Sequence, residues 1–176
     1  MTDQLLTKYK VYRKIAKDGD IILTHSTKFI AESIQWVDNA HWHHCELVHW
    51  THGRLMGFGA HPEGTFADFL SLRIKKKGWD DFMIIRPTAE AHKITEAFYK
   101  LYARSEEFNQ YDYSMIFHLL LKKFNINNKL GKENKNICSE LVQQFMAYLG
   151  DDLNIVTPQD VIRYLNDNYN ILIIEF

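Results

Sequence analysis

The sequence predicts an α+β fold, in which an antiparallel sheet, mostly from the first half of the chain, packs against helices that come mostly from the second half. The first half contains short apolar runs separated by turn residues. The second half contains longer segments with apolar residues at helical spacing. With 46% hydrophobic and 14% aromatic residues, the 176-residue chain can bury one sizeable core, which predicts a single domain over residues 1–176.

The first half is expected to supply an opening helix and most of the strands. Leu5, Tyr9 and Tyr12 lie at helical spacing within residues 3–16. Gly19 and Asp20 then turn the chain into a short buried strand. Residues 29–37 also have apolar residues at helical spacing, which predicts a second helix. Strands are expected at 21–24, 43–50, 54–60 and 81–87, and the turn at 51–53 makes the second and third of them a hairpin.

The second half is expected to be mainly helical. Thr88 can cap a long helix that continues to about Phe108. Thr157, Pro158 and Asp160 occupy the N-cap, N1 and N3 positions of another helix, which is a strong start signal. Further helices are expected at 113–124 and 139–150, and a closing strand at 170–176.

Charge and cysteine content exclude several classes of protein. The formal net charge is −1, from 21 basic and 22 acidic residues, which argues against a nucleic-acid binder. The basic run Arg73–Gly78 is interpreted as a solvated loop or strand edge. Two cysteines do not make a disulfide-stapled secreted fold. No apolar run approaches the roughly 20 residues that span a bilayer, and the N-terminus lacks a signal-peptide run. A cytoplasmic protein without stable membrane insertion is therefore expected, and signal-less export, as for a phage protein, stays open.

Cys138 is the first candidate for chemistry because it lies at or just before the first turn of the helix at 139–150. Unsatisfied N–H groups and the helix dipole favour an anion there, which lowers a thiol pKa. The same N–H groups can bind the oxyanion that forms when a carbonyl is attacked. The alternative is a buried structural cysteine, and the helix pattern alone favours that alternative.

His44 is the candidate base for this thiol. Strand alternation places His44 and Glu46 on one face, and His43 and Cys45 on the other. A strand histidine that faces the start of a cysteine-bearing helix is the two-element arrangement of a Cys–His hydrolase.

The histidines around this strand also suggest a metal site. His43, Cys45 and His49 share one face, and these residue types bind zinc. Neither a helical HExxH motif nor paired CxxC motifs are present. No metal and no other cofactor is therefore expected, and the histidines are interpreted as packing and surface residues.

Six sequence blocks occur in a characteristic order over roughly residues 19–161. They are "GDIILTH", "HHCELV", "FGAHPEGT", "YDY", "NICSELV" and "TPQDV". Together they resemble the circularly permuted papain-like family, the permuted branch of the NlpC-type thiol hydrolases, whose broad group includes lecithin retinol acyltransferase. The resemblance implies a permuted papain-like fold, with His44 as the base and Cys138 as the nucleophile. It also implies that Tyr111 and Asp112 shape the site, and Tyr111 could aid the oxyanion.

One departure from the family concerns the residue that orients the base. The family often places a polar residue, commonly glutamate, just before an alanine on the strand after the histidine strand, and here that position is Gly59. Glycine cannot orient an imidazole. His61, Glu63 and Glu46 are the available substitutes, and His61 is narrowly favoured as the third catalytic residue. Without an orienter, the cysteine and histidine could still work as a dyad.

The expected function is a cysteine hydrolase, an amidase or peptidase that works through an acyl-enzyme. The resemblance implies cell-wall peptides or N-acyl amides as substrates. Tyr111, Glu46 and His25 are the candidates for substrate contact, although a capped strand end is the simpler interpretation of His25. A lipid acyltransferase or thioesterase with the same nucleophile is the alternative. A third hypothesis, favoured by Gly59, is a binding domain that lost turnover. The oligomeric state stays open.

Overall fold

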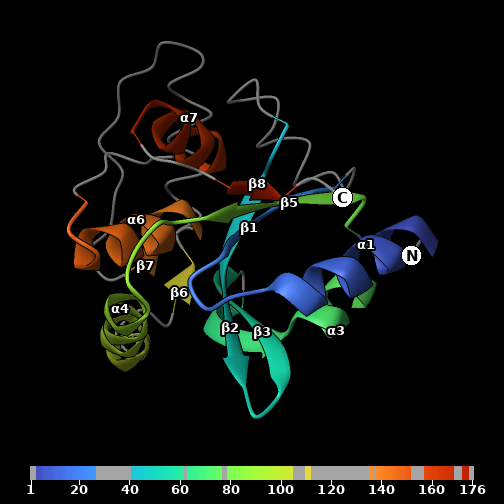
Figure 1. Cartoon of the computed structure of the whole chain (residues 1–176), viewed down its shortest axis with the longest axis horizontal. Coiled ribbons are helices and arrows are strands. Elements are labelled where there is room, and N and C mark those ends of the chain that lie inside the picture. Colours follow the sequence, from blue (N-terminus) through green and yellow to red (C-terminus); the bar gives the residue numbers. More distant parts are fainter. Residues whose placement is uncertain are drawn as a thin grey trace.

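A six-stranded antiparallel sheet with the strand order β4-β3-β2-β1-β5-β8 organises the molecule (Figure 1). The computed structural model describes residues 3–26, 41–61, 63–76, 79–104, 110–111, 135–136, 138–151, 157–168 and 172–174. Only the backbone is described at positions 76, 110–111, 135–136, 165–168 and 172–174. The strands are β1 Ile21–His25, β2 His44–Thr51, β3 Arg54–His61, β4 Gly64–Phe69, β5 Asp81–Arg86 and β8 Leu172–Ile174.

Helices cover both faces of this sheet, with α4 and α6 on one side and α1 and α3 on the other (Figure 1). Their bounds are α1 Asp3–Ile15, α3 Leu70–Lys76, α4 Ala91–Arg104, α6 Cys138–Tyr148 and α7 Pro158–Asn168. None of the described helices combines the length and the apolar content needed to cross a membrane. A separate parallel pair joins β6 Gln110–Tyr111 to β7 Lys135–Asn136.

Strand alternation divides the core into two clusters, one on each face of the sheet. Ile21 and Leu23 of β1 pack with α4 and α6, whereas Ile22 between them packs with α1 and α3. β2 follows the same rule, because Leu47 joins the first cluster and Val48 joins the second. Both faces of the central strands are therefore buried, which explains why these strands read as nearly continuous apolar runs.

The α+β class and most of the predicted elements are confirmed. The opening helix, the β2–β3 hairpin and the closing strand are present. Helix α7 begins with the expected capping box: the Asp160 carboxylate accepts the Thr157 N–H at 3.0 Å, and the Thr157 hydroxyl accepts the Asp160 N–H at 3.3 Å. The helix expected from Thr88 begins instead at Ala91, because the Ile94 N–H donates to the Glu90 carbonyl and makes Glu90 its cap. The helices expected at 29–37 and 113–124 lie outside the described residues, as does Phe108.

The segment from Gly64 to Lys76 was not predicted as regular structure, yet it forms β4 and α3. The interpretation of the basic run Arg73–Gly78 as a solvated loop or strand edge is wrong for its first residue. Arg73 lies in α3 and is only 1% exposed, while Lys75 in the same helix is exposed. Leu70 and Ile74 anchor α3 to the sheet, and Arg73 is carried inward with them.

Candidate active site

Cys138 is the first residue of α6, as its position in the sequence suggested. It belongs to the same buried cluster as Cys45 of β2, and it is 4% exposed. Both cysteines are free thiols. The helix start therefore carries the thiol directly onto the strand that begins with His44.

His44 and Cys138 interact closely enough to shift each other's pKa in opposite directions. Burial by itself would lower the pKa of His44, but the charge and hydrogen bonding of Cys138, followed by those of Glu46, raise it to about 9. The pKa of Cys138 is well below its usual value, because hydrogen bonding from Cys45 and the charge of His44 outweigh burial. Both shifts favour a thiolate–imidazolium pair over a neutral thiol and imidazole.

The Cys45 thiol is a second neighbour of the Cys138 sulfur. Burial first, and then the hydrogen bond and charge of Cys138, raise the pKa of Cys45, so that this thiol keeps its proton. A protonated thiol beside a thiolate donates to it, which stabilises the anion. The sequence suggests Cys45 only as a possible metal ligand. Its place directly after His44 in the chain was the feature that could have identified it as a neighbour of Cys138.

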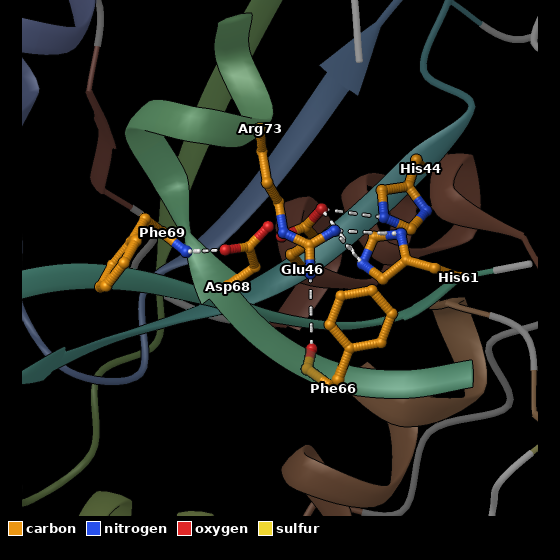
Figure 2. Close-up of polar contacts among 7 residues, drawn as sticks. All are labelled: His44, Glu46, His61, Phe66, Asp68, Phe69 and Arg73. Atoms are coloured by element: carbon orange, nitrogen blue, oxygen red, sulfur yellow. Dashed lines mark hydrogen bonds and ion pairs between the residues drawn. The ribbon is translucent and has the colours of Figure 1, made fainter. Parts of the chain in front are cut away.

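Glu46 makes a hydrogen bond to His44, the candidate base, and His61 lies against both residues. The His44 Nε2 atom lies 3.1 Å from Glu46 Oε1, and the His61 Nε2 atom lies 3.5 Å from the same oxygen (Figure 2). The His61 ring lies 4.8 Å from the His44 ring, centroid to centroid, and also contacts Arg73. Glu46 is 1% exposed, and its described contacts are with these buried side chains.

Two glycines of β3 provide space for this carboxylate. A Cβ atom added at Gly59 would lie 2.9 Å from Glu46 Cγ and 3.0 Å from His61 Nε2, and one added at Gly57 would overlap Glu46 Oε2. A side chain at either position would displace Glu46. The absence of a side chain at Gly59 therefore leaves room for a carboxylate from the neighbouring strand to reach His44.

Arg73 of α3 completes the buried cluster. Its Nε atom lies 3.3 Å from Glu46 Oε2, and its Nη1 donates to the ring of His61 (Figure 2). Burial would raise the pKa of Glu46, but His61, the hydrogen bond from His44 and the charge of Arg73 lower it to about 2. The carboxylate is therefore ionised at neutral pH.

The same cluster is the candidate metal centre. Among the described residues, His44, Glu46 and His61 form the one group of three potential ligands, with their ligand atoms within 4.8 Å of one another. The Arg73 guanidinium contacts Glu46 and His61 and places a permanent positive charge beside two of these ligands. This arrangement fits a carboxylate–guanidinium pair better than a divalent cation. The trio weighed from the sequence, His43, Cys45 and His49, does not form such a group.

The remaining candidates lie around this cluster with differing relevance. His25 stacks on His41 and bonds to its carbonyl oxygen at 2.9 Å, a strand-end role in agreement with the simpler interpretation. Glu63 is exposed in the β3–β4 turn. The backbone of Tyr111 pairs with Asn136, two residues before Cys138, while its side chain and Asp112 lie outside the described residues.

Comparison with known proteins shows similarity at the level of the fold. No family model matches the chain, and no curated protein matches it. Among solved structures, it is similar to the metalloprotein yiiX from Escherichia coli O157:H7, DUF1105, with a TM-score of 0.56 and 17% sequence identity over 86% of this chain and 81% of that chain. At that identity the likeness concerns the fold alone. The word metalloprotein describes yiiX, and the Arg73 contacts here do not favour a metal in the His44 cluster.

Proposed function

We propose that this chain is a thiol hydrolase of the permuted papain-like kind, with Cys138 as nucleophile, His44 as acid and base, and Glu46 as the residue that orients His44. The observation that carries the proposal is the buried Cys138–His44–Glu46 series, in which each group favours the charged form of the next. A structural cysteine has no need of a paired imidazole and carboxylate. The permuted papain-like fold itself is part of the proposal, since the α+β class is the level at which the architecture is established.

The proposed reaction has two half-steps. The Cys138 sulfur forms a bond to the substrate carbonyl carbon, and N–H groups at the start of α6 hold the oxyanion. His44 gives its proton to the leaving amine or alcohol as that bond breaks, which leaves a thioester on Cys138. His44 then takes a proton from water, the resulting hydroxyl attacks the thioester, and the acid leaves with return of the thiolate–imidazolium pair.

The proposed substrates are amide bonds of cell-wall peptides or N-acyl amides. Transfer or hydrolysis of a fatty acyl group would use the same thioester, so the intermediate is the decisive species. Gly59 no longer favours the third hypothesis, a binding domain without turnover, because Glu46 supplies a carboxylate to His44 from the neighbouring strand.

An acyl-enzyme is expected on Cys138 when the protein meets its substrate class. The protein would be mixed with a muropeptide, an N-acyl amide and a fatty acyl ester in parallel, acid-quenched, and measured by intact mass and peptide mapping. An added acyl mass on the Cys138 peptide supports the proposal, and the substrate that gives it distinguishes the amidase from the acyltransferase. Acylation of Cys45 alone, or hydrolysis without any protein adduct, would contradict it.

The pH dependence of hydrolysis is expected to show a decline above about pH 9. The pKa of His44 is raised to about 9 from an ordinary 6.5, so the imidazolium is present below that pH and is lost as the pH rises through it. Because the pKa of Cys138 is lowered, the thiolate persists at pH values where an ordinary thiol is protonated. The check is kcat/KM between pH 5 and 10.5.

Alkylation of the same protein by iodoacetamide is the control for that profile. Alkylation needs only the thiolate, so its rate should not decline above pH 9. A hydrolysis rate that instead climbs through pH 8–9, like that of an ordinary thiol, would mean that no ion pair forms.

A further inference from the structure

The Glu46 carboxylate contacts three side chains with its two oxygens. Oε1 is hydrogen-bonded to His44 Nε2 at 3.1 Å and lies 3.5 Å from His61 Nε2 (Figure 2). Oε2 lies 3.3 Å from Arg73 Nε, an ion pair in which neither atom makes a hydrogen bond. Arg73 comes from α3, a different element from the strand β2 that carries both Glu46 and His44. Asp68, the other carboxylate in this view, uses Oδ1 to accept the Phe69 N–H at 2.7 Å. Among the contacts described, Arg73 forms its ion pair with Glu46.

Charges of both signs meet in this small buried volume. The proposed resting state holds a Cys138 thiolate, a His44 imidazolium, a Glu46 carboxylate and the Arg73 guanidinium, with the His61 ring against the last two. Glu46 and Arg73 are each 1% exposed, so solvent supplies little compensation. Without the guanidinium, the site would lose one positive charge and would bind a proton more tightly. Protonation of Cys138 would then destroy the nucleophile.

Several contacts fix the guanidinium in one place. Its Nη1 donates to the His61 ring, its Nη2 donates to the Phe66 carbonyl at 3.5 Å, and it lies over the Phe66 ring at 5.0 Å from the centroid. These contacts use the planar fork of arginine, which a lysine ammonium cannot reproduce. A guanidinium held in this way also restrains the carboxylate it faces.

We propose that Arg73 is a positioning residue of this site: acting through Glu46, it balances and aims the carboxylate so that the Cys138–His44 ion pair can form. The inference rests on the proposed thiol hydrolase function and adds to it a residue from a helix that carries neither the nucleophile nor the base. His61 is the support that keeps Arg73 in place.

The test measures the pH midpoint of Cys138 alkylation by iodoacetamide, which needs no substrate. In Arg73→Met the midpoint is expected to rise by about one unit, because the site gains negative charge. Below the midpoint the alkylation rate then falls about tenfold, in proportion to the thiolate fraction. Arg73→Lys restores the charge without the fork and should recover part of the shift. Gly59→Ala alters no charge but presses on Glu46 Cγ and on His61 Nε2, so it should displace the carboxylate and raise the midpoint as well.

Arg86→Met is the matched control, because it also removes a guanidinium from a buried carboxylate, here Asp20, in another part of the fold. It is expected to lower the melting temperature and leave the midpoint unchanged. If Arg73→Met folds and keeps the midpoint of the parent protein, Arg73 has only a packing role and the inference fails. If Arg73→Met does not fold, Arg73→Lys and Gly59→Ala decide the question in the same assay.

The two proposals fail in different ways. If the alkylation midpoint depends on Arg73 but no substrate gives an acyl-enzyme, the inference about the ion pair stands and the proposed hydrolase function fails. If Cys138 forms an acyl-enzyme but the midpoint is the same in the Arg73 variants and in Gly59→Ala, the hydrolase function stands and the inference fails.

Discussion

Cys138→Ala is expected to lower kcat/KM by about 10⁴- to 10⁶-fold, the range in which loss of a nucleophile acts in hydrolases of this logic. The Cys138 sulfur is the atom that would carry the acyl group, because Cys45, the other described thiol, keeps its proton and donates a hydrogen bond to it. Removing the thiolate also removes the first of the influences that raise the pKa of His44, so that pKa should fall from about 9 toward its ordinary value. Steady-state kinetics and NMR titration of the His44 ring would measure both effects.

Cys45→Ala is the matched control because it removes the neighbouring thiol and keeps the nucleophile. It should retain measurable turnover, with the acidic limb of the profile moved to higher pH, since Cys45 donates to the thiolate. Residual turnover in Cys138→Ala comparable to that of Cys45→Ala would exclude Cys138 as the nucleophile.

Asp20→Ala is expected to produce the largest loss of stability, roughly 3–5 kcal/mol in the free energy of unfolding. Asp20 is fully buried and accepts hydrogen bonds from Arg86 Nε at 2.6 Å, Arg86 Nη2 at 2.8 Å, the Tyr12 hydroxyl at 2.9 Å and the Lys17 N–H at 3.0 Å. The substitution leaves a guanidinium and a buried hydroxyl without their acceptor. The melting temperature should fall by about 10 °C for a chain of this size.

Glu96→Gln is the control for that result. Glu96 and Lys100 form an ion pair one turn apart on the exposed face of α4, with an N–O distance of 2.7 Å, and solvent screens this pair. Its loss should move the melting temperature little, as measured by thermal and urea unfolding. Equal losses in Asp20→Ala and Glu96→Gln would mean that burial of Asp20 adds nothing to the strength of its contacts.

The sequence alone was enough to predict Cys138 and His44, the proposed nucleophile and the proposed base. A cysteine at a helix start is a local feature, and so is a histidine in an alternating strand, because periodicity and capping act over a few neighbouring residues. The same locality explains why α7 was predicted well, since the Thr157–Asp160 box lies within its own first turn.

Other parts of the site depend on contacts that no local pattern encodes. Both His61 and Glu46 lie beside His44, and the hydrogen bond from Glu46 depends on how strands β2 and β3 and helix α3 pack together. The sequence predicts Arg73 at the surface because basic runs are usually solvated, yet α3 packs against the sheet and desolvates this arginine.

From the sequence alone came the α+β class, most strand and helix positions, and the pairing of Cys138 with His44 as a hypothesis. The tertiary structure placed the Glu46 carboxylate against His44, left room for it at Gly57 and Gly59, and set the Arg73 guanidinium beside it. The physical reason is the distance along the chain over which each effect acts. Backbone propensity and apolar periodicity depend on neighbouring residues, whereas the charge state of a buried group depends on whichever segments the fold brings around it.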